Sequence, residues 1–228
     1  MRYLVFLATV SLSSILFAIP QNDAPGIDPI YLDAFDLRPV VKSPDGKLGI
    51  TVTGPKESWE AWVTIAPSDF PGGPIQVWPI QRNVNVLWRP DSHAFALTDD
   101  RYANLAYVLV FGTHFAMGEG SAELGVQVED LTPTMRKVFD ERAQKYYAPA
   151  DYDTRLFYAK ALRWIENDRI VVGVNAKTVG ASELLANRGI RDWIVGYLVD
   201  VPRKTVLSEI ESGQMLSQYG IDLEKQNW

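Results

Sequence analysis

The chain contains a recurring phrase in which a Pro-Asp turn is followed at once by an apolar segment. The first copy is Ser43-Pro44-Asp45-Gly46 and the second is Arg89-Pro90-Asp91-Ser92. A degenerate third copy reads Trp164-Ile165-Glu166-Asn167-Asp168. The first two prolines lie 46 residues apart, within the ~40–50-residue period of four-stranded β modules. The repeat predicts an all-β chain built from successive modules.

Each turn has residues suited to reversing the chain. Proline presets φ at the first central position of a turn, and Asp followed by Gly or Ser tolerates the unusual backbone angles that come next. After the first turn, apolar and small or polar residues alternate over 48–53, which predicts a half-buried strand. The unbroken apolar run Leu105–Phe111 predicts a strand buried on both faces.

Composition excludes several function classes. The 228 residues are 47% hydrophobic and 22% charged, as expected of a globular chain. The formal net charge of −6 argues against a nucleic-acid-binding surface, which would be basic. The chain has no cysteine, so disulfides, thiolate metal sites and a cysteine nucleophile are excluded.

The N-terminus has the pattern of a secretory signal peptide. Arg2 precedes the apolar run Tyr3–Phe17, and Ala18 is a suitable residue before a cleavage site. The run is short and contains several serines, whereas a spanning helix needs ~20 apolar residues. We therefore expect residues 1–18 to be removed, with no stable membrane insertion afterwards and a periplasmic or secreted location.

The remaining chain divides by composition. Residues 19–30 are rich in proline and predict a linker, and residues 31–207 hold the repeated modules. An insertion over 112–150 separates the second module from the third. Its first part, to Asp130, has an irregular pattern, and Thr132–Tyr147 predicts a helix with Pro133 in its first turn. Residues 208–228 predict a polar tail or loose helix.

These turns and strands resemble the blades of TolB-like and dipeptidyl-peptidase N-terminal β-propellers. The best match is Trp88-Arg89-Pro90-Asp91-Ser92, followed by Thr98-Asp99-Asp100 and Tyr107–Val110. The first copy departs from the pattern with Lys42 in place of the tryptophan, and the third with Glu166-Asn167 in place of Pro-Asp. The resemblance implies three four-stranded antiparallel blade-like meanders, an incomplete propeller with one helical insertion.

An incomplete propeller leaves open ends. Closed propellers typically have 4–8 blades, whereas this chain has room for only three or four. The exposed blade faces then need a cover. The predicted helix is one candidate cover, and a homodimer that completes the ring is another.

Candidate chemical groups are few. Asp99, Asp100 and Asn104 offer oxygen ligands for a cation, but they also fit a turn in which Asp side chains bond nearby amides. His93 and His114 are the only histidines, too few for a zinc site. Gly118–Ala122 lacks the G-x-S-x-G pattern of a nucleophile elbow. We expect no metal and no cofactor, and no catalytic residue can be assigned.

These observations favour an exported, non-catalytic binding or protein-interaction module. We expect a protein partner to contact the insertion, since loops on rigid scaffolds carry function. A periplasmic hydrolase acting on carbohydrate or peptide through unidentified carboxylates is the alternative, and a structural component of an envelope assembly is a third class. The expected interaction residues are Phe115, Met117, Met135, Phe139, Tyr146 and Tyr147.

Overall fold

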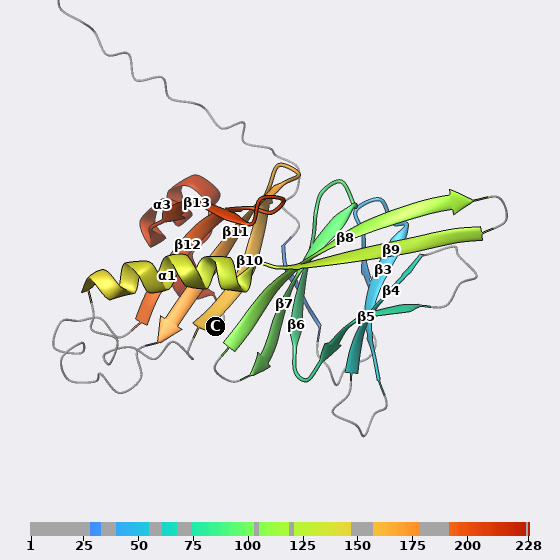
Figure 1. Cartoon of the computed structure of the whole chain (residues 1–228), viewed down its shortest axis with the longest axis horizontal. Helices are drawn as coiled ribbons and strands as arrows, with labels where there is room; N and C mark the ends of the chain where they lie inside the picture. The colour runs from blue at the N-terminus through green and yellow to red at the C-terminus, as the bar shows by residue number, and fades with distance from the viewer. Residues whose placement is uncertain are drawn as a thin grey trace, which may run out of the picture.

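The computed structural model describes residues 28–32, 40–54, 61–67, 74–102, 105–118, 121–146, 157–177, 192–226 and 228. Within this part of the chain strands predominate and form two sheets (Figure 1). The all-β class is confirmed. The predicted signal peptide lies outside the described residues, and so does all of the predicted linker except 28–30.

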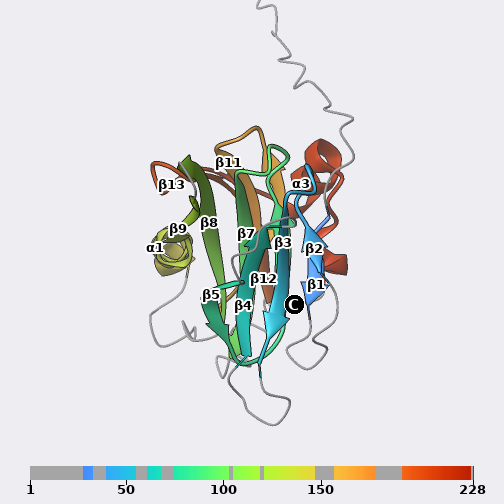
Figure 2. The same cartoon turned by 90° about the vertical axis from the view of Figure 1, so that its right-hand side faces the viewer.

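The smaller sheet, sheet B, contains the first module. Its strands lie in chain order and pair antiparallel, starting on either side of the first Pro-Asp turn. Figure 2 shows them side by side. The strands are β2 (Val41–Lys42), β3 (Leu48–Thr53), β4 (Ala61–Pro67) and β5 (Ile75–Ile80).

The larger sheet, sheet A, contains nine strands among the described residues, in the order β1-β6-β7-β8-β10-β11-β12-β13, with β9 paired to β8. The end of the predicted linker is part of it, because Ile30 opens β1 and pairs with Val86. The strands are β1 (Ile30–Leu32), β6 (Val84–Trp88), β7 (Ala94–Tyr102), β8 (Leu105–Gly118), β9 (Ser121–Asp130), β10 (Phe157–Ile165), β11 (Arg169–Lys177), β12 (Asp192–Asp200) and β13 (Thr205–Ile210).

The expectation of three separate four-stranded blades is not confirmed, because the described strands form one sheet of nine and one sheet of four. Strands β6 to β9 pair antiparallel in chain order, and so do β10 to β13. These two runs, the second and third modules, are nevertheless joined in one sheet. Phe157 and Tyr158 of β10 pair in parallel with Leu105 and Ala106 of β8. Turn motifs in a sequence do not reveal such a lateral pairing.

The turns that open the modules share one construction. Gly46 and Ser92 occupy the same place after the proline and have φ of 73° and 65°. The carboxylates of Asp45 and Asp91 each accept the backbone N–H two residues later. In the third module Trp164 pairs with Ile170, whereas Trp88 pairs with Phe95, so the third turn is one residue shorter. Loss of Pro-Asp in the third copy accompanies this shortening.

Successive modules are joined by equivalent hydrogen bonds. Trp88 Nε1 donates to Val41 O at 3.3 Å, and Trp164 Nε1 donates to Leu87 O at 3.1 Å. Val41 and Leu87 hold the same place, three residues before the turn proline of their modules. The same packing relationship therefore occurs twice, from the first module to the second and from the second to the third.

The first and second modules bury an aromatic core between them. Phe95 and Phe111 stack with ring centroids 4.8 Å apart, and Trp88 lies 5.1 Å from Phe95. Residues of sheet B and of β6–β8 contribute to this core. Each such aromatic pair contributes ~0.5–1.5 kcal/mol beyond its buried area. The inward residues that complete it from sheet B are Val41, Leu48, Ile50, Val52, Ala61, Val63, Ile65 and Ile80.

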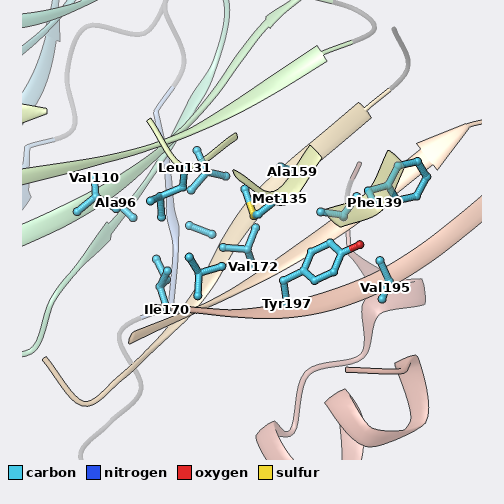
Figure 3. Close-up of a cluster of buried hydrophobic side chains, with 14 of the residues drawn as sticks. Ala96, Val110, Leu131, Met135, Phe139, Ala159, Ile170, Val172, Val195 and Tyr197 are labelled. Carbon is cyan, nitrogen blue, oxygen red and sulfur yellow. The ribbon is translucent and has the colours of Figure 1, made fainter. Parts of the chain in front are cut away.

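The second core lies between the second and third modules and includes α1 (Thr132–Tyr146). Figure 3 shows Met135 and Phe139 of this helix among residues of β10, β11 and β12, beside Val172 and Tyr197. Met135 is 0% exposed and Phe139 5%. The predicted helix is thus present, and its apolar face completes this core.

The third module is covered on its far side by the C-terminal segment. Helix α3 (Ser212–Tyr219) and the 3₁₀ turn η1 (Leu223–Lys225) bury Met215 and Leu223 against it. Gly196 permits this contact, since a Cβ there would lie 2.5 Å from Met215 Sδ. The sequence predicted a polar tail or a loose helix over 208–228; a helix is present there, and it is packed on the third module as part of a cap. Figure 2 shows α1 and α3 on opposite sides of the molecule.

Candidate interaction surface

Strands β8 and β9 form a long ribbon that continues past the end of β7 (Figure 1). β8 pairs with β7 as far as Gly112 and then continues to Gly118, paired with β9 alone among the described strands. We call the segment 113–128 the arm. The sequence predicted irregular structure over 112–130, but the hairpin is regular up to its tip, because residues 121–128 supply a full antiparallel partner for β8.

The outer edge of β9 carries backbone groups that face away from β8. Leu131 N–H donates to Val108 O at 2.9 Å, which fixes the phase of the ladder. Antiparallel residues alternate between positions that bond their partner and positions that do not. By this alternation Gly125, Gln127 and Glu129 bond β8. The residues whose N–H and C=O face outward are Ala122, Leu124, Val126 and Val128.

The arm is partly apolar and partly open to solvent. Val128 is 46% exposed. Leu124 and Val126 are half-buried and pack against the aromatic core of the first and second modules. Gly125, Gln127 and His114 are exposed. One side of the ribbon is therefore held on the body, while its edge and the region of Val128 remain accessible.

The charged residues of the β8–β9 ribbon are all acidic. Residues 105–130 contain Glu119, Glu123, Glu129 and Asp130 and no lysine or arginine. Glu129 forms an ion pair with Lys204 at the turn between β12 and β13. The ribbon thus accounts for much of the net charge of −6.

The other described edge strands are protected against pairing with a further chain. β1 has three residues and β2 has two. β5 contains Pro79, which lacks an N–H. β13 lies beside α1, whose Arg142 forms an ion pair with Glu209. Short strands, prolines and covering elements are the usual means of blunting an edge. β9 has ten residues and contains neither proline nor lysine.

The predicted interaction residues are placed differently from the expectation. Met135 and Phe139 are buried in the second core and cannot form an exposed surface. The sequence assigned them to a surface because one amphipathic helix face looks the same whether it meets a partner or the chain's own core. Phe115 and Met117 lie on β8 within the arm, at positions paired with Leu124 and Ala122. Tyr146 ends α1, and Tyr147 lies outside the described residues.

Asp99 and Asp100, weighed in the sequence as candidate cation ligands or turn residues, are not part of a cation site in the described structure. Asp99 and Asp100 belong to β7, which continues to Tyr102, so they lie in a strand and not in the turn that the sequence also allowed. Asp99 is 0% exposed and accepts a hydrogen bond from Trp78 Nε1 at 2.7 Å. Asn104 lies outside the described residues. Within the described part of the chain, no group of three or more His, Cys, Asp or Glu residues is placed to hold a metal ion.

Asp100 instead belongs to a half-buried charged pair with Lys160 of β10. Burial raises the pKa of Asp100, an effect that Lys160 opposes and Asp99 reinforces. Burial likewise lowers the pKa of Lys160, and Asp100 opposes this change. The pair lies where the second and third modules meet. Sequence reasoning missed it because Lys160 comes from a strand 60 positions later.

The remaining candidates have ordinary surroundings. His93 is 73% exposed in the second turn, with Nδ1 3.7 Å from Asp91 Oδ2. Its position agrees with a solvated turn residue. None of the helices in the described residues is long and apolar enough to cross a membrane.

Comparison with known proteins gives no relative to guide the assignment. The chain matches no protein-family model, no curated protein and no solved structure.

Proposed function

We propose that this chain is an exported, non-catalytic protein-binding module whose partner contacts the β8–β9 arm. The observation that carries the proposal is the arm itself: a long ribbon that continues past the end of β7, with an unblunted outer edge and an exposed Val128. Exposed edges are a template for pairing with another chain, and most folds protect them. The edge of β9 is unprotected while the other described sheet edges are protected, and this contrast favours a binding role for β9.

The scaffold for this arm is proposed to be an arc of three propeller-like blades. The repeated indole bonds of Trp88 and Trp164 support this proposal, since each joins equivalent positions of adjacent modules. A ring-completing homodimer has less support. The C-terminal cap occupies the face where a fourth module would pack, and Lys42 replaces the tryptophan that would bond a preceding module.

The experiment that tests the proposal shortens the arm and leaves its base, Val126 to Val128, in place. Deleting the whole insertion would also remove Met135 and Phe139 from the second core, so it would unfold the body. Replacing residues 114–125 with Asn-Gly keeps the pair Thr113–Val126 and supplies a two-residue hairpin turn. Partner recovery after crosslinking in the source cells should fall strongly, because Ala122 and Leu124 are removed from the outward row. Far-UV circular dichroism should stay close to that of the parent chain, and the urea midpoint should fall modestly because Leu124 no longer packs on the aromatic core.

The alternative function makes the opposite prediction. A hydrolase acting through carboxylates in the body would keep its activity on chromogenic glycosides or peptides after the arm is shortened. Hydrolysis by the purified parent chain that persists in the shortened chain would refute the non-catalytic proposal. Recovery of the same partner by both chains would refute the role of the arm.

A further inference from the structure

We infer that the partner binds by adding a strand to the outer edge of β9, and that the added segment is extended and basic. The inference rests on the proposed function and specifies its chemistry. Strand addition gives affinity through main-chain hydrogen bonds, and alternate side chains give specificity.

The backbone geometry supports the first half of this inference. The outward positions Leu124, Val126 and Val128 are successive alternate residues, so their N–H and C=O groups lie in one row along the edge. In the described structure β9 forms a ladder with β8 alone. A strand laid along this row would continue the sheet by one more member.

The charge of the ribbon supports the inference that the added segment is basic. The ribbon over 105–130 has four acidic residues and no lysine or arginine. A second copy of this chain would bring the acids of its own β9, Glu123, Glu129 and Asp130, to the same edge, and like charges on neighbouring strands are destabilising. A segment with lysine or arginine alternating with apolar residues would instead pair its charges with the acids and place its apolar residues near Val128, which is 46% exposed.

The test uses the full chain and two labelled peptides, one of alternating Lys and Val and one of alternating Glu and Val. Fluorescence anisotropy measures binding, and amide hydrogen exchange read by NMR locates it. We expect the basic peptide to bind and to slow exchange at Leu124, Val126 and Val128 by about tenfold or more, as hydrogen bonding of open amides requires. The acidic peptide should bind at least about tenfold more weakly.

Substitutions on the edge separate strand addition from simple charge attraction. V128P removes an outward N–H while keeping the ladder to β8, whereas V128T keeps the N–H and the β-branched shape. We expect V128P to weaken peptide binding about tenfold, because the main-chain hydrogen bond from residue 128 to the added strand is lost. V128T keeps this bond and should change binding less than about twofold. Q127K adds a positive charge beside the edge and should weaken binding of the basic peptide about threefold. Q127E adds a negative charge and should not weaken it. Circular dichroism confirms that each variant is folded.

Three results would overturn the inference. They are equal binding of both peptides, binding without slowed exchange at the three outward amides, and slowed exchange that depends on protein concentration without peptide, which would indicate a second copy as the occupant. Each would leave the arm-shortening result standing, because that result does not depend on how the arm is bound. Loss of the proposed function itself would show as unchanged partner recovery by the shortened chain.

Discussion

Trp88 and Trp164 hold equivalent positions in successive modules, and the indole of Trp164 bonds the carbonyl of Leu87, the residue next to Trp88. Trp88 in turn bonds Val41 of the first module. The turns of successive modules are also hydrogen-bonded to one another, first to second and second to third. Asp45 N–H donates to Ser92 Oγ at 3.0 Å, and Arg89 Nη1 donates to Asn167 O at 2.6 Å. The modules are therefore joined at one end by a chain of specific contacts, which makes the body a rigid support for the arm.

Replacing Trp164 with phenylalanine should destabilise the protein by about 2 kcal/mol, from one lost hydrogen bond and the void left by a smaller ring. Trp164 is 7% exposed. Urea denaturation measures the effect. W62F serves as the control, because Trp62 lies half-buried on sheet B and its loss should matter less. Equal destabilisation by the two substitutions would argue against a joining role for Trp164.

Replacing Arg89 with lysine should also destabilise the chain, by roughly 1–2 kcal/mol, because one ammonium cannot reproduce the bonds of a planar guanidinium. Arg89 Nε donates to Asp91 Oδ1 at 2.7 Å, and the guanidinium carbon lies 5.9 Å from the Trp164 ring centroid. R203K is the matched control, since Arg203 is 79% exposed in its pair with Asp200. Surface pairs contribute little. A thermal melt in which both variants behave like the parent would contradict this expectation.

Asp91 should give the second turn a dependence on acid. Partial burial acts to raise its pKa, but hydrogen bonds from Arg89 and from the His93 N–H outweigh this effect and hold the pKa below the ordinary 3.8. Because the folded-state pKa is depressed, the stabilisation is present above pH 3.8 and is lost as the pH falls through the folded value. D91N should therefore be less stable than the parent at pH 7, and the difference should shrink below pH 3.8. A difference that does not vary with pH would exclude the carboxylate charge as its cause.

The contact between Gly196 and Met215 should behave as a coupled pair. M215A should cost about 2–5 kcal/mol, because Met215 is 0% exposed in the cap. G196A should be destabilising by overpacking, since the new methyl group meets the Met215 side chain. In the double variant the methyl fills part of the vacated space, so the two effects should fall short of additivity by at least about 1 kcal/mol. L216A is the control for shortening a side chain on the same helix: Leu216 is 53% exposed, so its loss should destabilise the protein much less than M215A. Additive effects would show that the two residues do not pack as described.

Local patterns predicted much of the fold. Alternation after Gly46, the apolar run from Leu105 and the cap-like start at Thr132 correspond to β3, β8 and α1. These features are local, so the periodicity of side chains and the chemistry of turns are sufficient to find them. The third turn was recognisable by pattern although its proline is absent.

Features that depend on long-range contacts were not predictable. The parallel pairing of β10 with β8 joins Phe157 to Leu105, and nothing near either residue indicates the other. Met215 and Leu223 stand in a polar stretch, so their burial in the cap follows only from the fold. The candidate surface was predicted in part. The sequence indicated the insertion as the interaction surface. Within it, however, the pattern favoured the helix face with Met135 and Phe139, which belongs to the core, and gave no indication of the edge of β9.

The most direct measurement of the central claim is site-specific photo-crosslinking in the source cells. A photoreactive amino acid is placed at Val128, on the arm, or at Leu207, on β13, which are 46% and 45% exposed. If the partner contacts the arm, position 128 should give one defined crosslinked product and position 207 should give none. The same products from both positions, or a product from position 207 alone, would contradict this claim.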